Sequence, residues 1–281
     1  MKDTLAVLLT CHNRKAKTLT CLQNLFEASL PESIKKADIY LVDDGSTDGT
    51  SKAVLKEHPN VNVIQGNGNL FWNQGMRLAW SKAAKAGKYD FYLWLNDDVI
   101  LDKLALIELF DCYKETLSSF NQMSIITGAF KNSKFGNEFS YGGRTESENI
   151  IPNGNLQKCK YINGNTVLVS KQIYNELGNL SSDYTHAMGD FDYGLRSLKA
   201  GFNNYTTKTY IGVCPINEQP KWSNPNIALK TRLKLFKSPT GLNYKEYIFF
   251  RKKFWGVKWI IFAVKAYIKV LFPSFYKKLR V

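Results

Sequence analysis

The sequence lacks the spacings and segments that mark several common classes of protein. Its five cysteines form no C-x-x-C pair and are odd in number, which argues against a zinc site or a disulfide framework and favours a reducing cytosol. From Met1 the chain runs through a short apolar stretch into His12-Asn13-Arg14 with no cleavage site, so neither a signal peptide nor export is predicted. There is no internal repeat, and residues 228–281 contain a single acid, Glu246.

What the sequence does contain is a sharp division of charge. The 281 residues carry a net charge of +14. Residues 228–281 hold fourteen Lys and Arg against one acid, whereas residues 1–227 hold 24 Lys and Arg against 23 Asp and Glu. The chain is therefore predicted to consist of a nearly neutral domain over residues 1–227 and a basic, aromatic helical extension over residues 228–281.

Strand-length apolar runs alternate with helix-length segments through the neutral part, a pattern typical of an α/β fold with a mostly parallel central sheet flanked by helices. The predicted strands cover residues 5–9, 39–42, 61–64, 91–95, 124–130 and 167–169. Helices are predicted at about 15–28, 72–85, 102–118, 171–177 and 190–200, with another through Val54 that either Ser46 or Asp48 caps.

Three acidic clusters occur at or after predicted strand or helix boundaries: Asp43-Asp44, Asp97-Asp98 and Asp190-Phe191-Asp192. Open α/β sheets bind ligands at the carboxyl ends of their strands, so one crevice fed by several strand ends is expected. Carboxylates there serve as hard oxygen ligands for a divalent metal or as a general base. For Asp97-Asp98 taken alone, ordinary turn or cap chemistry is the competing interpretation.

Four ordered motifs resemble those of glycosyltransferase family 2 over roughly residues 4–215. They are residues 10–14 after the first strand, 42–48 after the second, 95–99 after the fourth, and 189–196. Residues 68–77 are similar to the variant of that family found in bacterial surface-polysaccharide assembly. The one departure from the family pattern is Gly189, which stands where an acid usually precedes the base.

The resemblance implies a GT-A fold and an inverting, metal-dependent transfer of a sugar from a nucleotide-sugar donor. The acceptor it implies is a hydroxyl of a glycan or lipid-linked molecule in bacterial cell-surface polysaccharide synthesis. Asp190 falls at the catalytic base, Asp98 at the Mn²⁺ or Mg²⁺ ligand, and Asp97 at the donor hydroxyls. The residues implied to bind the nucleotide sugar are Thr10, Cys11, His12, Asn13, Asp43, Asp44, Asn69, Trp72, Asn96 and Asp97. Among them Asp44 is the preferred contact to the nucleobase of the donor.

Several of these residues have a plainer structural interpretation. Trp72 follows helical spacing with Trp80, which favours core packing. His186 and Asp192 are candidates for the acceptor side, but a hydrogen-bonded structural histidine is at least equally expected. Pairing of Asp192 with Arg196, four residues later, is slightly preferred over an acceptor role. The segment 163–165 either shapes the sugar pocket or forms a simple turn.

Residues 254–273 are mostly apolar and aromatic and long enough to suggest a membrane span. On one continuous helix, however, Lys258, Lys265 and Lys269 would fall within about 40° of one another, which suits a helix lying in the membrane interface. Residues 245–281, which include Lys277, Lys278 and Arg280, are therefore predicted to bind the inner face of the cell membrane peripherally. Packing on the catalytic domain or in a homodimer is the alternative.

Two other functions compete with sugar transfer. A sugar-phosphate nucleotidyltransferase would need a Gly-rich phosphate loop after the first strand, where Cys11-His12-Asn13 stands. A non-enzymatic polybasic module for membrane or nucleic acid would fit the tail, but not a neutral body with three placed carboxylate clusters. No nucleic-acid partner is therefore predicted.

Overall fold

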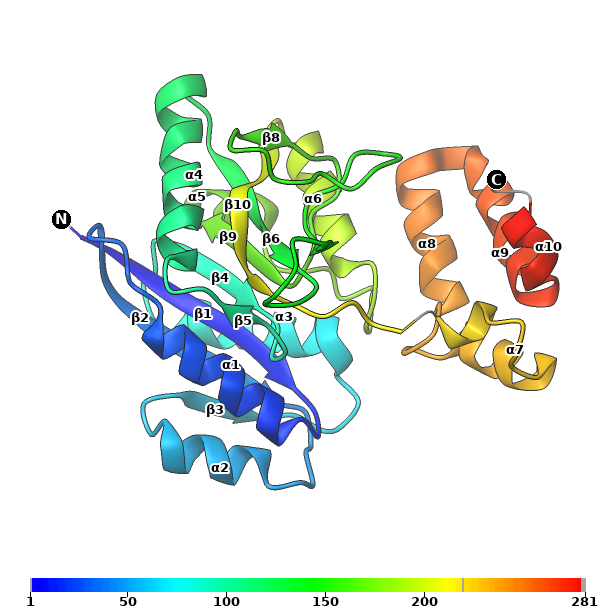
Figure 1. Ribbon diagram of the computed structural model, residues 1–281, viewed down its shortest axis with the longest axis horizontal. Coiled ribbons are helices and arrows are strands. Elements are labelled where there is room, and N and C mark those ends of the chain that lie inside the picture. Colours follow the sequence, from blue (N-terminus) through cyan, green and yellow to red (C-terminus); the bar gives the residue numbers. More distant parts are fainter. Residues whose placement is uncertain (1, 219, 279–281) are drawn as a thin grey trace. The chain divides into compact units, whose positions relative to one another are not determined.

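A single mixed sheet forms the centre of the first of two compact units in the computed structural model, which describes residues 2–218 and 220–278 (Figure 1). Within those residues the sheet has ten strands in the order β3-β2-β1-β4-β9-β6-β10-β5, with β7 paired to β6 and β8 to β10. The strands are β1 Asp3–Cys11, β2 Ile34–Asp43, β3 Asn62–Gln65, β4 Phe91–Leu95, β5 Ile100–Leu101, β6 Ser124–Lys131, β7 Phe139–Tyr141, β8 Gln157–Lys158, β9 Thr166–Ser170 and β10 Asn203–Val213.

Strand direction in this sheet is mostly parallel, which confirms the fold class predicted from the sequence. β1 pairs in parallel with β2 on one side and with β4 on the other, and β3 continues the parallel set beyond β2. β9 runs antiparallel to both β4 and β6. Because β9 is reversed, its first residues lie beside the last residues of β4, with Thr166 opposite Leu95.

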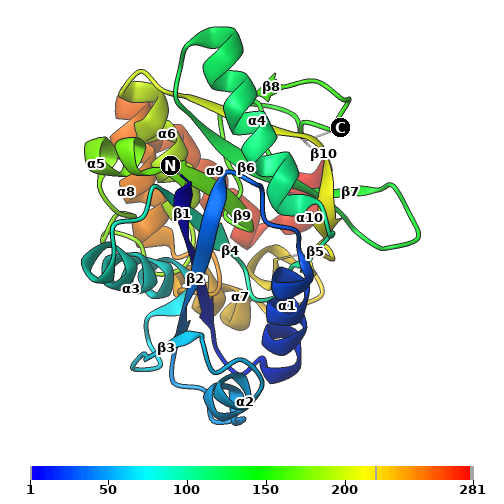
Figure 2. The same ribbon diagram turned by 90° about the vertical axis from the view of Figure 1, so that its left-hand side faces the viewer.

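Helices cover both faces of the sheet (Figure 2). In the first part of the chain they are α1 Lys15–Glu27, α2 Thr50–Glu57, α3 Phe71–Ala86, α4 Ala105–Phe120, α5 Lys171–Leu177 and α6 Gly189–Lys199. Successive strand residues point to opposite faces, so Leu5, Val7 and Leu9 enter the core beneath α1 and α4. Ala6 and Leu8 enter the other core, beneath α3 and α5. Burial on both faces explains why β1 reads as a continuous apolar run.

Several local features differ from the sequence prediction, which gave no strand at β5, β7 or β8. The eleven-residue strand β10 was not predicted, because its buried positions include Asn204, Thr206 and Thr207, which mask the apolar pattern of a strand. The prediction that Ser46 or Asp48 is the N-cap of α2 was wrong, since Gly49 occupies that position with φ +81°. Asp48 still contributes there, because its Oδ1 accepts the Thr50 N–H at 3.0 Å.

A second compact unit is formed by Asp183–Gly189 together with the residues from Asn217 on. Its helices are α7 Leu229–Lys237, α8 Tyr244–Trp255, α9 Trp259–Leu271 and α10 Pro273–Lys278, with short 3₁₀ turns η1 Lys221–Ser223 and η2 Gly256–Lys258. They enclose a small core of Trp222, Phe236, Ala266 and Val270. The boundary thus falls before Asn217 rather than after residue 227, because Trp222 packs on Phe236 at a ring distance of 5.8 Å.

The prediction of one continuous helix over residues 254–273 was wrong. Gly256 adopts φ +50° and ψ −136° and ends α8, so Lys258 lies ahead of α9 rather than on its surface. Among residues 2–218 and 220–278, no helix combines the length and the apolar character needed to cross a bilayer. Arg280, included in the predicted membrane-binding segment, lies outside the described residues.

Trp80 of α3 lies at the centre of an aromatic cluster that joins the helix to the sheet. Its ring contacts those of Tyr92, Trp94 and Tyr193 at centroid distances of 5.4–5.5 Å, and the side chain is fully buried. We expect Trp80→Ala to lower the free energy of unfolding by about 3–5 kcal/mol, measured by chemical denaturation, because it leaves a large cavity. The control Phe135→Ala removes a fully exposed ring and should change stability by less than about 0.5 kcal/mol. A loss below 1 kcal/mol in Trp80→Ala would contradict this account.

Candidate active site

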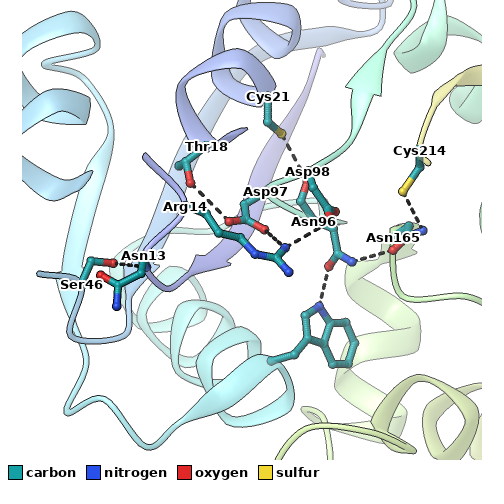
Figure 3. Close-up of polar contacts among 11 residues, drawn as sticks. Asn13, Arg14, Thr18, Cys21, Ser46, Asn96, Asp97, Asp98, Asn165 and Cys214 are labelled. Atoms are coloured by element: carbon teal, nitrogen blue, oxygen red, sulfur yellow. Dashed lines mark hydrogen bonds and ion pairs between the residues drawn. The ribbon is translucent and has the colours of Figure 1, made fainter. Parts of the chain in front are cut away.

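The motifs that follow β1 and β2 are joined by direct hydrogen bonds. The Asp44 N–H donates to the Cys11 carbonyl at 2.9 Å, and His12 Nδ1 lies 2.6 Å from the Asp44 carbonyl oxygen. That carbonyl can only accept, so Nδ1 carries the proton and Nε2 accepts from the Asn13 side chain at 3.1 Å. Asn13, at φ +50°, donates its N–H to the Ser46 hydroxyl at 2.8 Å (Figure 3).

Asp43 and Asp44 are both buried, and their carboxylates accept hydrogen bonds from the protein. Asp44 Oδ1 accepts the Gly68 N–H at 2.8 Å, and its Oδ2 accepts the Leu70 and Phe71 N–H groups at 2.8 and 2.9 Å. Asp43 accepts the Ser46 N–H at 2.9 Å and the Ser51 hydroxyl. These carboxylates therefore shape the loops around the end of β2, and their proposed contacts with a nucleoside stay predictions.

The paired acids after β4 converge on one cation, Arg14 (Figure 3). Arg14 Nη1 lies 3.1 Å from Asp97 Oδ1 and 3.0 Å from Asp98 Oδ2. Asp97 is buried, and burial raises its pKa to about 6 although the Arg14 charge lowers it. Thr18 of α1 donates to its second oxygen at 3.3 Å.

These two carboxylates also fit a divalent metal. A single guanidinium nitrogen already bridges them, which shows that an oxygen of each can face the same positive centre. Within the described part of the chain, no group of three or more His, Cys, Asp or Glu side chains gathers to hold an ion. The protein thus offers two carboxylates, a set that suits an ion completed by substrate phosphates and water.

A chain of side-chain amides links the end of β4 to the start of β9. The Trp72 indole N–H donates to Asn96 Oδ1 at 2.5 Å, and Asn96 Nδ2 donates to Asn165 Oδ1 at 2.5 Å. The Asn165 amide in turn donates to Cys214 Sγ at 3.3 Å (Figure 3). Antiparallel pairing of β9 with β4 places Asn165 there, and its carbonyl accepts the Asn96 N–H at 2.9 Å.

Asp190 stands in the first turn of α6 with both carboxylate oxygens positioned by backbone donors. Oδ2 accepts the Gly164 N–H at 3.0 Å, and Oδ1 accepts the Phe191 N–H at 2.8 Å. Burial raises the pKa of Asp190 to about 6, against the two N–H groups, which lower it. A carboxyl group with that pKa is ionised at neutral pH yet still basic enough to take a proton.

Gly164 lets Trp72 and Asp190 approach the same stretch of backbone. A Cβ at residue 164 would lie 2.5 Å from Trp72 Cζ2 and 3.4 Å from Asp190 Cβ. Trp72 is partly buried and also meets Trp94 edge-on at 6.2 Å. The segment 163–165 is therefore more than a simple turn, because it connects the amide chain from Asn96 with Asp190.

The remaining predicted residues have mainly structural surroundings. Asp192 is fully buried and accepts the Arg196 Nε–H at 2.7 Å, as the preferred interpretation predicted. Thr10 is buried between β1 and α3. Its Oγ1 lies 2.2 Å from the position that a Cβ at residue 75, a glycine of α3, would occupy. Burial raises the pKa of the Cys11 thiol, and Asn69 is exposed.

His186 is partly buried in the segment Asp183–Gly189 of the second unit. Its place on the acceptor side stays a prediction, as does the nucleotide-sugar role of Asn69.

Sequence reasoning missed the role of Arg14. It was quoted within the first motif but given no function, although it is the residue that ties the end of β1 to both acids after β4. The signal was available, because the last residue of this motif is a cation and an acid pair follows another strand of the predicted parallel sheet. Asn165 was considered only within the segment 163–165, as part of the sugar pocket or of a simple turn, and its bond to Asn96 depends on the pairing of β9 with β4.

Comparison with known proteins identifies a family model and several relatives that match this chain. The model of glycosyl transferase family 2 matches residues 6–166. Poly-beta-1,6-N-acetyl-D-glucosamine synthases from Staphylococcus aureus strains COL and N315 are each 28% identical over 107 residues, which is 38% of this chain and 24% of theirs. The chain thus spans about a quarter of the length of these curated relatives.

Solved structures share the fold at low sequence identity. The mannosyltransferase PcManGT from Pyrobaculum calidifontis, in complex with GDP-Man and Mn²⁺, has a TM-score of 0.55 at 14% identity over 88% of this chain and 64% of its own. S. aureus TarS residues 1–349, in complex with UDP-GlcNAc, has a TM-score of 0.54 at 12% identity over 88% and 67%. These comparisons support neither a nucleotidyltransferase nor a polybasic binding module.

Replacement of Gly164 tests the contact between this glycine and Trp72. In Gly164→Ala the new methyl group overlaps the indole, so we expect Trp72 to shift, its bond to Asn96 to be lost, and the tryptophan fluorescence to change. The free energy of unfolding should fall by at least about 0.5–1.5 kcal/mol, the net contribution of one hydrogen bond. The matched control Gly136→Ala meets only Ser133 Oγ at 3.3 Å and Glu138 N at 3.9 Å and should leave both readouts unchanged. Unaltered fluorescence in Gly164→Ala would contradict the predicted contact.

Proposed function

The chain belongs to glycosyl transferase family 2, and from this premise we propose that it moves a sugar from a nucleotide-sugar donor to a hydroxyl group with inversion at the anomeric carbon. The acceptor proposed is a glycan or lipid-linked molecule of bacterial cell-surface polysaccharide. The position of Asp190 carries the proposal. Its carboxylate is partly buried, fixed by two backbone N–H groups and adjacent to Gly164, which connects it to the residues that follow β4.

The donor is assigned to the carboxyl ends of β1, β2 and β4. Residues 10–13, Asp43, Asp44 and the loop over residues 66–71 would enclose the nucleoside. Trp72 and Asn96 would line the sugar side. His12 and Asn13 are exposed. Gly68, at φ +82°, lets the backbone approach a ligand closely.

Asp98 would hold Mn²⁺ or Mg²⁺, and Asp97 beside it would face the hydroxyls of the donor. When bound, such an ion supplies Lewis-acid stabilisation of the negative charge that develops on the departing nucleoside diphosphate. Support comes from the convergence of both carboxylates on a single cationic nitrogen of Arg14, and from the Mn²⁺ in the PcManGT complex.

Asp190 would act as the general base. Its carboxylate accepts the proton of the acceptor hydroxyl as that oxygen attacks the anomeric carbon from the face opposite the leaving group. The Gly164 and Phe191 N–H groups hold the carboxylate in one orientation, so little rearrangement is needed when the proton moves. Gly189 leaves Asp190 without the neighbouring acid usual in the family, and the two backbone donors perform the orienting task here.

The donor is identified by incubating the full chain with Mn²⁺ and a panel of nucleotide sugars that begins with UDP-GlcNAc and GDP-Man, the ligands of the two similar structures. Binding by the folded state raises the thermal midpoint, and the gain in stability grows with the logarithm of ligand concentration over Kd. A donor that stabilises the protein and is slowly hydrolysed with Mn²⁺ supports the proposal. No stabilisation by any nucleoside diphosphate or its sugar would overturn it.

Asp190→Asn tests the base. Turnover should fall by about 10²–10⁴-fold, the usual contribution of general base catalysis, while donor affinity stays within about threefold because the amide keeps the side-chain size.

Wild-type turnover should rise with pH through about 6, because only the ionised form of Asp190 accepts a proton, and should level off above about pH 7. The pKa of Asp97 is also raised to about 6, so the residual rate of Asp190→Asn is the control. If that residual rate keeps the same rise with pH, the rise does not belong to Asp190.

A further inference from the structure

The second unit carries a surface of large apolar side chains on and around α9 and α10, called here the α9–α10 surface. Eight residues between 257 and 275 are each at least 37% exposed. They are Val257, Ile260, Ile261, Val264, Tyr267, Leu271, Phe272 and Phe275. Single exposed apolar residues are ordinary, whereas several exposed on one face of a helix mark an interaction site.

Helix α9 divides its apolar residues between two faces. Ala263, Ala266 and Val270 are buried against the small core of the second unit. At about 100° per residue, the five exposed apolar positions from Ile260 to Leu271 fall in an arc of about 120° on another side of the helix. Tyr267, at one edge of this arc, also packs its ring on Phe236 and Tyr244 inside the unit. The outward apolar face of the helix therefore consists of Ile260, Ile261, Val264 and Leu271.

Cations border this arc, and acids are missing from it. Lys258 and Lys265 are exposed, and Lys265 follows the arc at about 40° beyond Ile261. Lys252 lies with its Nζ 4.4 Å from the Trp259 ring. From residue 247 to residue 281 the sequence has no Asp or Glu. An apolar strip edged by cations matches an anionic, partly apolar partner.

A second copy of the chain fits this surface poorly. Residues 228–281 carry fourteen cations and one acid, so two such surfaces placed together would repel each other. The one acid, Glu246, accepts the Thr185 N–H at 2.9 Å and the Thr185 hydroxyl within the same unit. It is therefore engaged internally and does not neutralise a facing copy.

We propose that the α9–α10 surface binds the anionic face of a lipid bilayer. Helix α9, with 13 residues, is shorter than the about 20 that a span needs, and it lies in the plane of the interface with Ile260, Val264 and their neighbours among the acyl chains. The stems of the lysines at its edge lie along the apolar strip while their ammonium groups reach lipid phosphates. This arrangement differs from the one predicted from the sequence, since Gly256 separates α8 from α9 and Lys269 lies over the Trp222 ring at 4.8 Å.

Co-sedimentation of the full chain with vesicles tests the proposal, using phosphatidylcholine alone and phosphatidylcholine mixed with phosphatidylglycerol. The wild type should bind the anionic vesicles and lose binding at high salt. Lys258→Gln with Lys265→Gln should weaken partitioning by about 30-fold, since each lysine near an anionic surface contributes a factor of about five. Ile260→Ser with Val264→Ser should weaken it by at least about tenfold.

Matched controls come from the first unit. Lys82→Gln with Lys85→Gln removes two exposed cations of α3, and Phe135→Ser removes a fully exposed ring; both should leave partitioning unchanged. Equal loss in these controls, or no binding to anionic vesicles, would overturn the proposal. A third outcome would also overturn it: the protein does not bind vesicles, sediments as a dimer, and loses the dimer in Ile260→Ser. The α9–α10 surface would then bind a second copy of the chain. Vesicle binding needs no donor, so its outcome is separate from that of sugar transfer.

A second inference, which rests on the proposed function, concerns Arg14. One nitrogen of its guanidinium contacts both Asp97 and Asp98, and the side chain is 45% exposed. The place where a metal would meet these carboxylates is thus already filled by a cation on a side chain that is free to leave toward solvent.

We infer that Arg14 holds the two carboxylates together until metal and nucleoside diphosphate arrive, and then pairs with the diphosphate. The guanidinium suits both partners, because its planar donors match carboxylate and phosphate oxygens alike. Metal and nucleotide therefore bind cooperatively, and Mn²⁺ alone binds weakly because it competes with Arg14.

Mn²⁺ titration of Arg14→Gln, followed by paramagnetic resonance with and without UDP or GDP, tests this inference. Without nucleotide, the variant should bind Mn²⁺ roughly tenfold more tightly than the wild type, because two partly exposed ion pairs no longer compete. The gain in Mn²⁺ affinity on adding nucleotide should be smaller in the variant. In Asp98→Asn, binding should be lost under both conditions. If nucleotide raises Mn²⁺ affinity by the same factor in Arg14→Gln as in the wild type, this inference alone is overturned. If no nucleotide binds at all, the proposed function is overturned.

Discussion

Parallel pairing of β1 with β2 and with β4 is the constraint on which the candidate site depends. Three adjacent strands that run in the same direction end at one edge of the sheet, so the residues that follow them lie close together. Asp44, Arg14 and Asp98 come from three separate motifs, yet hydrogen bonds and ion pairs join all three strand ends. The reversed strand β9 extends this edge, because its first residues adjoin the last residues of β4.

Because the strand ends meet, several carboxylates lie close together, where they repel one another and lose hydration. Hydrogen-bond donors of the protein offset this cost at each carboxylate. Backbone N–H groups of the loop over residues 66–71 satisfy Asp44, Arg14 bridges Asp97 and Asp98, and Gly164 and Phe191 supply two N–H groups to Asp190. Burial still raises the pKa of Asp190 to about 6. That residual cost of burial gives the carboxyl group a pKa suited to proton transfer near neutrality.

The second unit differs from the first in where its apolar residues lie. Its core is small, centred on Phe236 and Val270, and its helices leave large apolar residues on the outside. The segment Asp183–Gly189 belongs to this unit and is held there by the bonds from Thr185 to Glu246. The chain then continues into Asp190, which belongs to the first unit.

The sequence by itself determined the alternation of strands and helices, the order of the motifs and the charge division, because each is set by local composition and period. It indicated that Asp43, Asp98 and Asp190 serve one crevice, and it correctly favoured the Asp192–Arg196 pair, an i, i+4 contact within one helix. Only the tertiary structure decided that Arg14 bridges both acids after β4, that Asn165 meets Asn96, and that Gly164 contacts Asp190. Each of these contacts joins residues 26 to 84 positions apart, and such pairings depend on strand order and direction, which no local pattern encodes.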